Sequence, residues 1–480
     1  MGRRLENLRQ LYMYDTHSFT KAISFICCML VAIAIALLPF SYGVVSIRIP
    51  INLLYTALIL LVVPCHRQFE FVDIKNMAFP LICYAVVVCM AFISLVFAAD
   101  SSSTFRAIRQ YLLEPLLFMF LAYYVVKGLG RKGLVYFFCA VVLALCYHPI
   151  ITIYDFLSHN GSFGYYRAML PTYYAPATVY VFYLIVCFSF VFGIFLLSRD
   201  VLKNASFIFG IVCIFAFLCN GGRFALLACM AICFTPFVLC QYRKKARVLF
   251  GVSLFCVVAV CGVYELSQSW HQRFNFHNIA QNFHQVWSSN PAEMGKFSNA
   301  CSNKWLMCST HSMDTNSSIK IEESSLIRIS MLKSTLLAIA DNPWRPNGYH
   351  FQQFPYNIQN IFAIDSPKHP FSLTKIDDNR LISAHAHNHN YIVSIWFELG
   401  AIGFGASMLF FAYFIWSGYR EKIRCSIYGK GDIRDIFMLS VSIMLVALFV
   451  SNLFDCIPIR DGTLVLFILL GAFMGARYAR

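Results

Sequence analysis

Residues 179–197 read VYVFYLIVCFSFVFGIFLL and contain no charged side chain. An α-helix needs about 20 apolar residues to cross the hydrocarbon core of a bilayer, so this run alone is long enough for one crossing. Apolar runs of similar length recur on both sides of it along the chain. The pattern predicts an all-α, polytopic integral membrane protein.

The composition of the 480-residue chain supports the same fold class. Hydrophobic residues make up 59% of the chain and charged residues 13%, whereas a soluble chain carries about 25% charged residues. The net charge of +15 could indicate a nucleic-acid partner. However, Lys and Arg gather in short clusters between the apolar runs, which is typical of membrane topology. We therefore expect membrane lipids, and no nucleic acid, as partners.

The apolar runs predict about twelve transmembrane helices. Their expected positions are 22–43, 51–64, 77–97, 105–126, 133–155, 173–197, 203–219, 222–240, 247–266, 390–417, 435–452 and 461–477. The polar stretch 267–389 separates the ninth from the tenth. The expected organisation is thus a membrane part over 1–266, a loop domain over 267–389 and a second membrane part over 390–480.

The positive charges assign sides to these segments. With the N-terminus placed in the cytoplasm, a Lys or Arg cluster falls on every segment predicted to lie inside. Both termini are then cytoplasmic and the 267–389 loop lies outside. A long loop with helical patterning of its own is usually functional. Within it, residues 323–340 predict an amphipathic helix that the Asp-Asn-Pro of 341–343 ends.

Two arginines on the predicted outside stand out. Arg223 follows Asn220-Gly-Gly in a very short turn between two apolar helices. It could simply reach to water from the interface, but a guanidinium beside glycines also suits an anion such as phosphate. Arg328 lies on the polar side of the predicted loop helix. Taken alone, it is better explained as a solvated residue or as an ion-pair partner of Glu322 or Glu323.

Three alternating histidines precede the tenth predicted helix, at His385, His387 and His389. Such a trio is a weak metal signal, because no carboxylate lies immediately beside it. We expect no metal site. A neutral histidine at the water–lipid boundary is also a suitable general base near pH 7. Glu398 follows within the apolar run, where a carboxylate marks a functional or structural polar contact.

The ordered set of these motifs resembles the O-antigen ligase family. The motifs are Asn220-Gly-Gly-Arg223, Arg328 with the downstream 342–351 segment, and His389-Asn-Tyr leading to Glu398-Leu-Gly400-Ala-Ile-Gly403. They cover about 220–403. The twelve predicted helices with one large loop after the ninth extend the resemblance over the whole chain.

The resemblance implies a GT-C-like membrane glycosyltransferase that needs no metal or other cofactor. Members move O-antigen from undecaprenyl pyrophosphate to a sugar hydroxyl of lipid A–core, on the periplasmic face of the bacterial inner membrane. By position, Arg223 and Arg328 match arginines that hold the pyrophosphate, and His389 matches the essential histidine. His387 fits a looser version of the same motif and stays open as a substrate-binding alternative.

Three other functions compete with this one. An O-antigen polymerase shares the donor but tends to carry two sizeable outside loops. A protein oligosaccharyltransferase of the same superfamily often has a larger C-terminal region. A polysaccharide transporter or flippase belongs to a different class, and is expected to show internal repeats and ionisable residues deep in several helices.

Overall fold

A computed structural model describes residues 2–42, 45–65, 77–161, 177–241, 323–350, 389–423, 431–454 and 460–478, with a few single positions between 246 and 287. Every regular element in these ranges is a helix. The predicted helix 247–266, His385 and His387 lie outside the described residues.

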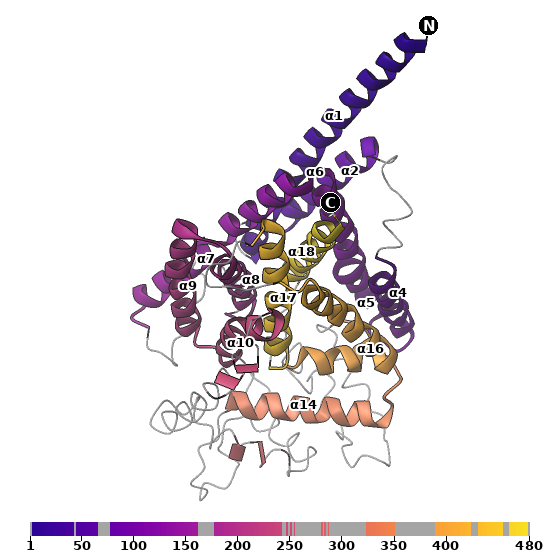
Figure 1. Cartoon of the computed structure of the whole chain (residues 1–480). Helices are drawn as coiled ribbons and strands as arrows, with labels where there is room; N and C mark the ends of the chain where they lie inside the picture. Colours follow the sequence, from indigo (N-terminus) through magenta and orange to yellow (C-terminus); the bar gives the residue numbers. More distant parts are fainter. Residues whose placement is uncertain are drawn as a thin grey trace, which may run out of the picture.

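Most helices lie where the apolar runs predict them (Figure 1). The α-helices are α1 (Gly2–Leu37), α2 (Arg48–Cys65), α4 (Ala78–Ile93), α5 (Ser101–Ile108), α6 (Glu114–Leu145), α7 (Tyr147–Ser158), α8 (Ala177–Leu197), α9 (Asp200–Asn220), α10 (Arg223–Leu239), α14 (Glu323–Asp341), α16 (Tyr391–Arg420), α17 (Ile433–Asn452) and α18 (Arg460–Tyr478). Two 3₁₀ turns, η1 (Leu38–Tyr42) and η3 (Ser94–Val96), and one π-helical turn, η4 (Arg109–Leu113), adjoin them.

Eight helical stretches among the described residues are long and apolar enough to cross a membrane. Two shorter apolar helices cover Arg48–Val62 and Arg223–Leu239. One of the eight, Ser101–Ser158, has 58 residues, and its helical geometry is interrupted at Gly130 (φ 60°, ψ −147°). That length exceeds two crossings of about 20 residues. The chain is a polytopic all-α membrane protein, and the total of twelve crossings remains a prediction.

Contacts at one end of the bundle join only segments predicted to lie inside. Arg131 lies 2.7 Å from Asp432, and both Arg434 and Arg477 pair with Glu421, at 2.8 and 3.3 Å. The α10 helix ends at the same level, since the amide of Gln241 donates to the carbonyl of Ile423 at 2.9 Å. Figure 1 places both chain termini at one end of the bundle and α14 across the other.

Contacts at the opposite end join segments predicted to lie outside. The amide of Tyr349 donates to Ser94 Oγ at 2.9 Å, and Asn390 Nδ2 donates to the carbonyl of Leu453 at 3.0 Å. Arg460 pairs with Glu114 at 2.7 Å. Since the contacts at each end connect distant segments of the same predicted side, the predicted order of crossings fits the packing.

The core is built around α8, α17 and α18. In the most apolar 18-residue stretch of α18, 89% of the residues are buried within the protein. The corresponding share for α9, at the periphery, is 28%. The α18 helix packs closely against α6: a Cβ at Gly471 would lie 2.0 Å from the carbonyl oxygen of Met119. Small residues at such a crossing let two helices approach closely inside a membrane.

Candidate active site

The turn between α9 and α10 presents Arg223 at the end of the bundle whose segments are predicted to lie outside, here called the outer end. Asn220 ends α9 and is fully buried, Gly221 adopts left-handed geometry (φ 63°), and Gly222 is the N-cap of α10. A side chain at 222 would crowd Asn220, because a Cβ there would lie 2.9 Å from Asn220 Oδ1. Arg223 is therefore the first residue of a helix, half-buried, beside backbone N–H groups that favour an anion.

His389 directly precedes α16 and is also half-buried. Its φ of 56° lies in the left-handed region, which is uncommon outside glycine. The next residue, Asn390, caps α16: its Oδ1 accepts from the amide of Val393 at 3.0 Å. Since Asn390 Nδ2 also donates to Leu453, at the end of α17, both helix ends fix the place of His389.

Arg328 lies near the start of α14 and is half-buried. This helix agrees closely with the predicted 323–340 and packs against α16 across the outer end of the bundle (Figure 1). The opposite end of α10 lies beside Ile423, at the far end of α16. The structure thus brings Arg223, Arg328 and His389 to the same end of the bundle.

The α16 helix departs from prediction in one respect. The apolar run 390–417 predicts one continuous helix, but Gly400 has φ 68° and ψ 175°, which breaks α16 into a short outer arm and a longer inner arm. Glu398 lies just before this break and is 5% exposed. The polar contact expected for it is present, since its Oε2 accepts from the amide of His350 at 2.9 Å. The helix begins at Tyr391, with Asn390 as its N-cap.

Residues 342–350, here called the strap, follow α14 in the chain and contact α16 on both sides of Gly400. Its His350 is 6% exposed, and burial lowers the pKa of the imidazole to about 3. The ring lies 4.3 Å, centre to centre, from that of Tyr111 on η4. Near the start of the strap, the guanidinium of Arg345 lies 5.0 Å from the centre of the Phe97 ring.

A polar cluster that the sequence did not predict lies at the outer ends of α6 and α18. Arg460 Nη2 lies 2.7 Å from Glu114 Oε2, and Arg109 approaches the other carboxylate oxygen at 3.9 Å. Next to Arg460, the fully buried Asp461 accepts a 2.7 Å hydrogen bond from the hydroxyl of Tyr183. The available signal was a carboxylate inside the predicted run 105–126, Glu114, and one at the start of 461–477, Asp461. Both positions are costly for a carboxylate unless it is paired.

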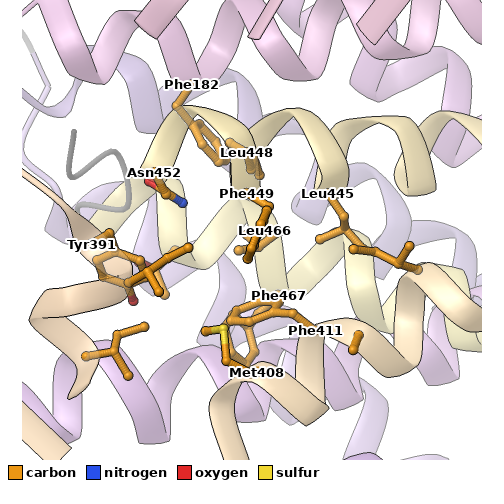
Figure 2. A pocket seen from close by; sticks show the side chains of 15 residues that line it. Phe182, Tyr391, Met408, Phe411, Leu445, Leu448, Phe449, Asn452, Leu466 and Phe467 are labelled. Atoms are coloured by element: carbon orange, nitrogen blue, oxygen red, sulfur yellow. The ribbon is translucent and has the colours of Figure 1, made fainter. Parts of the chain in front are cut away.

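An apolar groove of about 360 Å³ lies between the two arms of α16 and the helices α17 and α18 (Figure 2). Tyr391 and Asn452 bring polar atoms to one end of it, and hydrocarbon and aromatic side chains such as Leu445, Phe411 and Phe467 line the rest. A smaller pocket of about 50 Å³ adjoins the groove and is lined in addition by tyrosines, His350 and Glu398. An apolar groove with a polar mouth suits a lipid with a polar head.

Among the described residues, no group of three or more His, Cys, Asp and Glu side chains lies close enough to hold a metal ion. The expectation that the reaction needs no metal stays a prediction.

These features define a class: a multi-pass helical membrane protein with cationic and imidazole side chains at one end, and with an apolar groove whose polar end, at Tyr391 and Asn452, lies at the same end. Residues 205–408 match the family model described as O-antigen ligase, so this part of the chain is similar to that family. The family comprises glycosyltransferase-like enzymes. The matched region runs from α9 into α16 and contains Arg223, Arg328 and His389. No curated protein matches the chain.

Proposed function

We propose that the protein is an O-antigen ligase of the bacterial inner membrane. It transfers O-antigen polysaccharide from undecaprenyl pyrophosphate to a sugar hydroxyl of lipid A–core on the periplasmic face. The observation that supports the proposal is the family match over 205–408. The matched region contains Arg223, Arg328 and His389, which lie at one end of the bundle. Polysaccharide and lipid substrates in a membrane are what this family implies.

The chemistry assigns a separate role to each side chain. The acceptor hydroxyl attacks the anomeric carbon of the donor glycan, and His389 takes the hydroxyl proton as general base. The bond between the anomeric carbon and the pyrophosphate oxygen breaks, and the pyrophosphate leaves with the electron pair. Arg223 and Arg328 stabilise this departing negative charge. In-line displacement between base and leaving group inverts the configuration at the anomeric carbon.

The apolar groove could hold the hydrocarbon chain of a lipid substrate. Its polar end lies at Tyr391, two residues from His389, and apolar side chains of α16, α17 and α18 line the rest. A polyprenyl or acyl chain in the groove would leave its polar head at the outer end, next to the arginines. Because such a chain enters from the bilayer and not from water, van der Waals packing against the groove, and not the hydrophobic effect, favours its binding.

Deletion of the gene, followed by gel analysis of lipopolysaccharide, tests the proposal. Loss of the complete ladder, with lipid-linked O-antigen accumulating, is the expected result. A surviving band with a single repeat would indicate a polymerase instead. An unchanged ladder with glycans missing from proteins would indicate an oligosaccharyltransferase. Glycan trapped on the cytoplasmic side would indicate a flippase.

A further inference from the structure

The break at Gly400 interrupts the hydrogen bonding of α16, and the strap restores it. Asn347 donates to the carbonyl of Phe397 twice, from its backbone amide at 3.2 Å and from its side-chain Nδ2 at 3.0 Å. The amide of Ala401 donates to the carbonyl of Pro343 at 2.8 Å. The strap therefore supplies a partner on each side of the break. Buried backbone groups need such partners, because leaving one unpaired costs free energy.

Further contacts hold the strap in the same place. The indole Nε1 of Trp396 donates to the carbonyl of Pro343 at 3.1 Å, and the amide of His350 donates to Glu398 at 2.9 Å. Contact with the bend is so close that a Cβ at Gly400 would lie 2.3 Å from the carbonyl oxygen of Trp344. Only a residue without a side chain fits this position.

The strap continues directly from the last turn of α14. Thr335, Ala338 and Ile339 on α14 are buried, and α14 packs along α16. Arg328 lies 13 residues before Asp341, the end of α14, which corresponds to about 20 Å of helix. Since an α-helix transmits displacement along its axis, fixing the strap also fixes the position of Arg328.

We propose that Asn347 and Glu398 are positioning residues, which lock the strap into the α16 break and thereby hold Arg328 at the end of the bundle where His389 lies, for pyrophosphate binding. This inference rests on the proposed function. Glu398 acts as a hydrogen-bond acceptor for the backbone of His350 and takes no proton in the reaction. Asn347 acts as a donor that completes the hydrogen bonding of the broken helix.

Hydrogen exchange measured by mass spectrometry tests whether Asn347 and Glu398 hold the strap against α16, an attachment here called the lock. The experiment uses the full-length protein in nanodiscs, without any substrate. In Asn347→Ala and Glu398→Ala, we expect amides of the strap and of α14 to exchange at least tenfold faster, while α17 keeps its protection. Ser442→Ala is the matched control, because it removes a buried hydroxyl whose bond stays within its own helix, to the carbonyl of Met438. Unchanged exchange in α14 would overturn the proposal.

Affinity for undecaprenyl pyrophosphate tests the connection to Arg328. We expect Asn347→Ala and Glu398→Ala to weaken binding by about ten- to a hundredfold, and Glu398→Gln, which keeps an acceptor oxygen, to recover most of it. A Glu398→Gln variant that binds as weakly as Glu398→Ala would overturn the acceptor role.

A double-mutant cycle separates positioning from general stability. In an Arg328→Ala background, Asn347→Ala should weaken binding much less than in the wild type, because the cation that it positions is already absent. Additive effects would overturn positioning through Arg328. If Arg328→Ala itself binds and transfers like the wild type, Arg328 is not part of the site and positioning through it is overturned. Failure of the proposed function is read separately, from an unchanged lipopolysaccharide ladder after deletion of the gene.

Discussion

Arg460 Nη2 lies 2.7 Å from Oε2 of Glu114, a residue 346 positions earlier in the chain. The contact joins the outer end of the last helix, α18, to the start of α6. Arg460 is 18% exposed and Glu114 8%, so neither charge is fully solvated. A carboxylate at the end of an apolar run is tolerated there because the guanidinium is next to it.

Removing one partner of this ion pair should destabilise the protein. In Arg460→Ala, Glu114 stays buried without its closest cation, and we expect a loss of about 3–5 kcal/mol in the free energy of unfolding. A thermal melt followed by intrinsic fluorescence measures it. The double variant Glu114→Gln with Arg460→Gln should be more stable than either single alanine variant. A double variant as unstable as Arg460→Ala would contradict this account.

The two arginines of the matched region should be needed for transfer but not for folding. Arg223→Ala and Arg328→Ala should each cost about 2–4 kcal/mol of barrier, roughly 30- to 1,000-fold in rate. Transfer of lipid-linked glycan by purified protein measures the effect, and Arg106→Ala, at an exposed position of the same end, is the control. Near-normal transfer by either variant would remove that arginine from the site. EDTA should leave the wild-type rate unchanged.

The histidines before α16 should differ in importance. His389→Ala should lose about 10²–10⁴-fold in rate, as expected for a missing general base. His385→Ala should keep most activity, because it lies farther from the start of the helix. Single-turnover assays of His385→Ala, His387→Ala and His389→Ala decide which histidine is the base. An active His389→Ala together with an inactive His387→Ala would assign the role to His387. Three active variants would exclude all three histidines as the base.

Acid should release the strap. The pKa of His350 falls from 6.5 to about 3 when the strap docks, because the buried ring next to Tyr111 is desolvated and Glu398 bonds only its backbone. The docked state binds fewer protons, so its stability is complete above pH 6.5 and declines below it by about 1.4 kcal/mol per pH unit.

Hydrogen exchange of the strap, corrected for the intrinsic effect of pH, measures this release. From pH 7.5 to 5 we expect exchange to rise about 30-fold. The variant His350→Asn should lack this dependence. A flat profile for the wild-type protein would show that His350 does not control docking.

Alanine at position 400 should be poorly tolerated. Gly400→Ala places a methyl group against the backbone of Trp344 and forces a side chain into a positive φ of 68°. We expect a loss of about 1–3 kcal/mol and a detached strap. Gly405→Ala is the matched control on the same helix, since a Cβ there meets no atom within 4 Å. Equal stability of the two variants would contradict the packing at the break.

Hydropathy predicts the membrane part of the fold closely, because each crossing is a local property of about 20 residues. The predicted 461–477 is observed as Arg460–Tyr478, and 435–452 as Ile433–Asn452. The α1 helix instead begins at Gly2, since its first turns are polar and hydropathy does not detect them. Gly130 separates the two predicted runs 105–126 and 133–155, as the charges between them suggest.

The candidate site was predictable only where a residue type is unusual for its place. Arg223 and His389 stand out as polar groups next to the predicted outer boundary, whereas Arg328 was singled out only through the ordered set of motifs. The fold places all three at the same end. Asn347 and the break at Gly400 did not stand out, because backbone hydrogen bonds between distant segments leave no local signal in a sequence.

Main-chain atoms provide most of the donors and acceptors in the hydrogen bonds described above between the strap and α16. The backbones of Pro343, Asn347, His350, Phe397 and Ala401 take part, together with the side chains of Asn347, Trp396 and Glu398. A joint of this kind depends little on the identity of the other residues around it. Loops of foreign sequence could therefore be grafted onto this membrane scaffold without re-engineering the attachment point, provided that Gly400, Asn347 and Glu398 are kept.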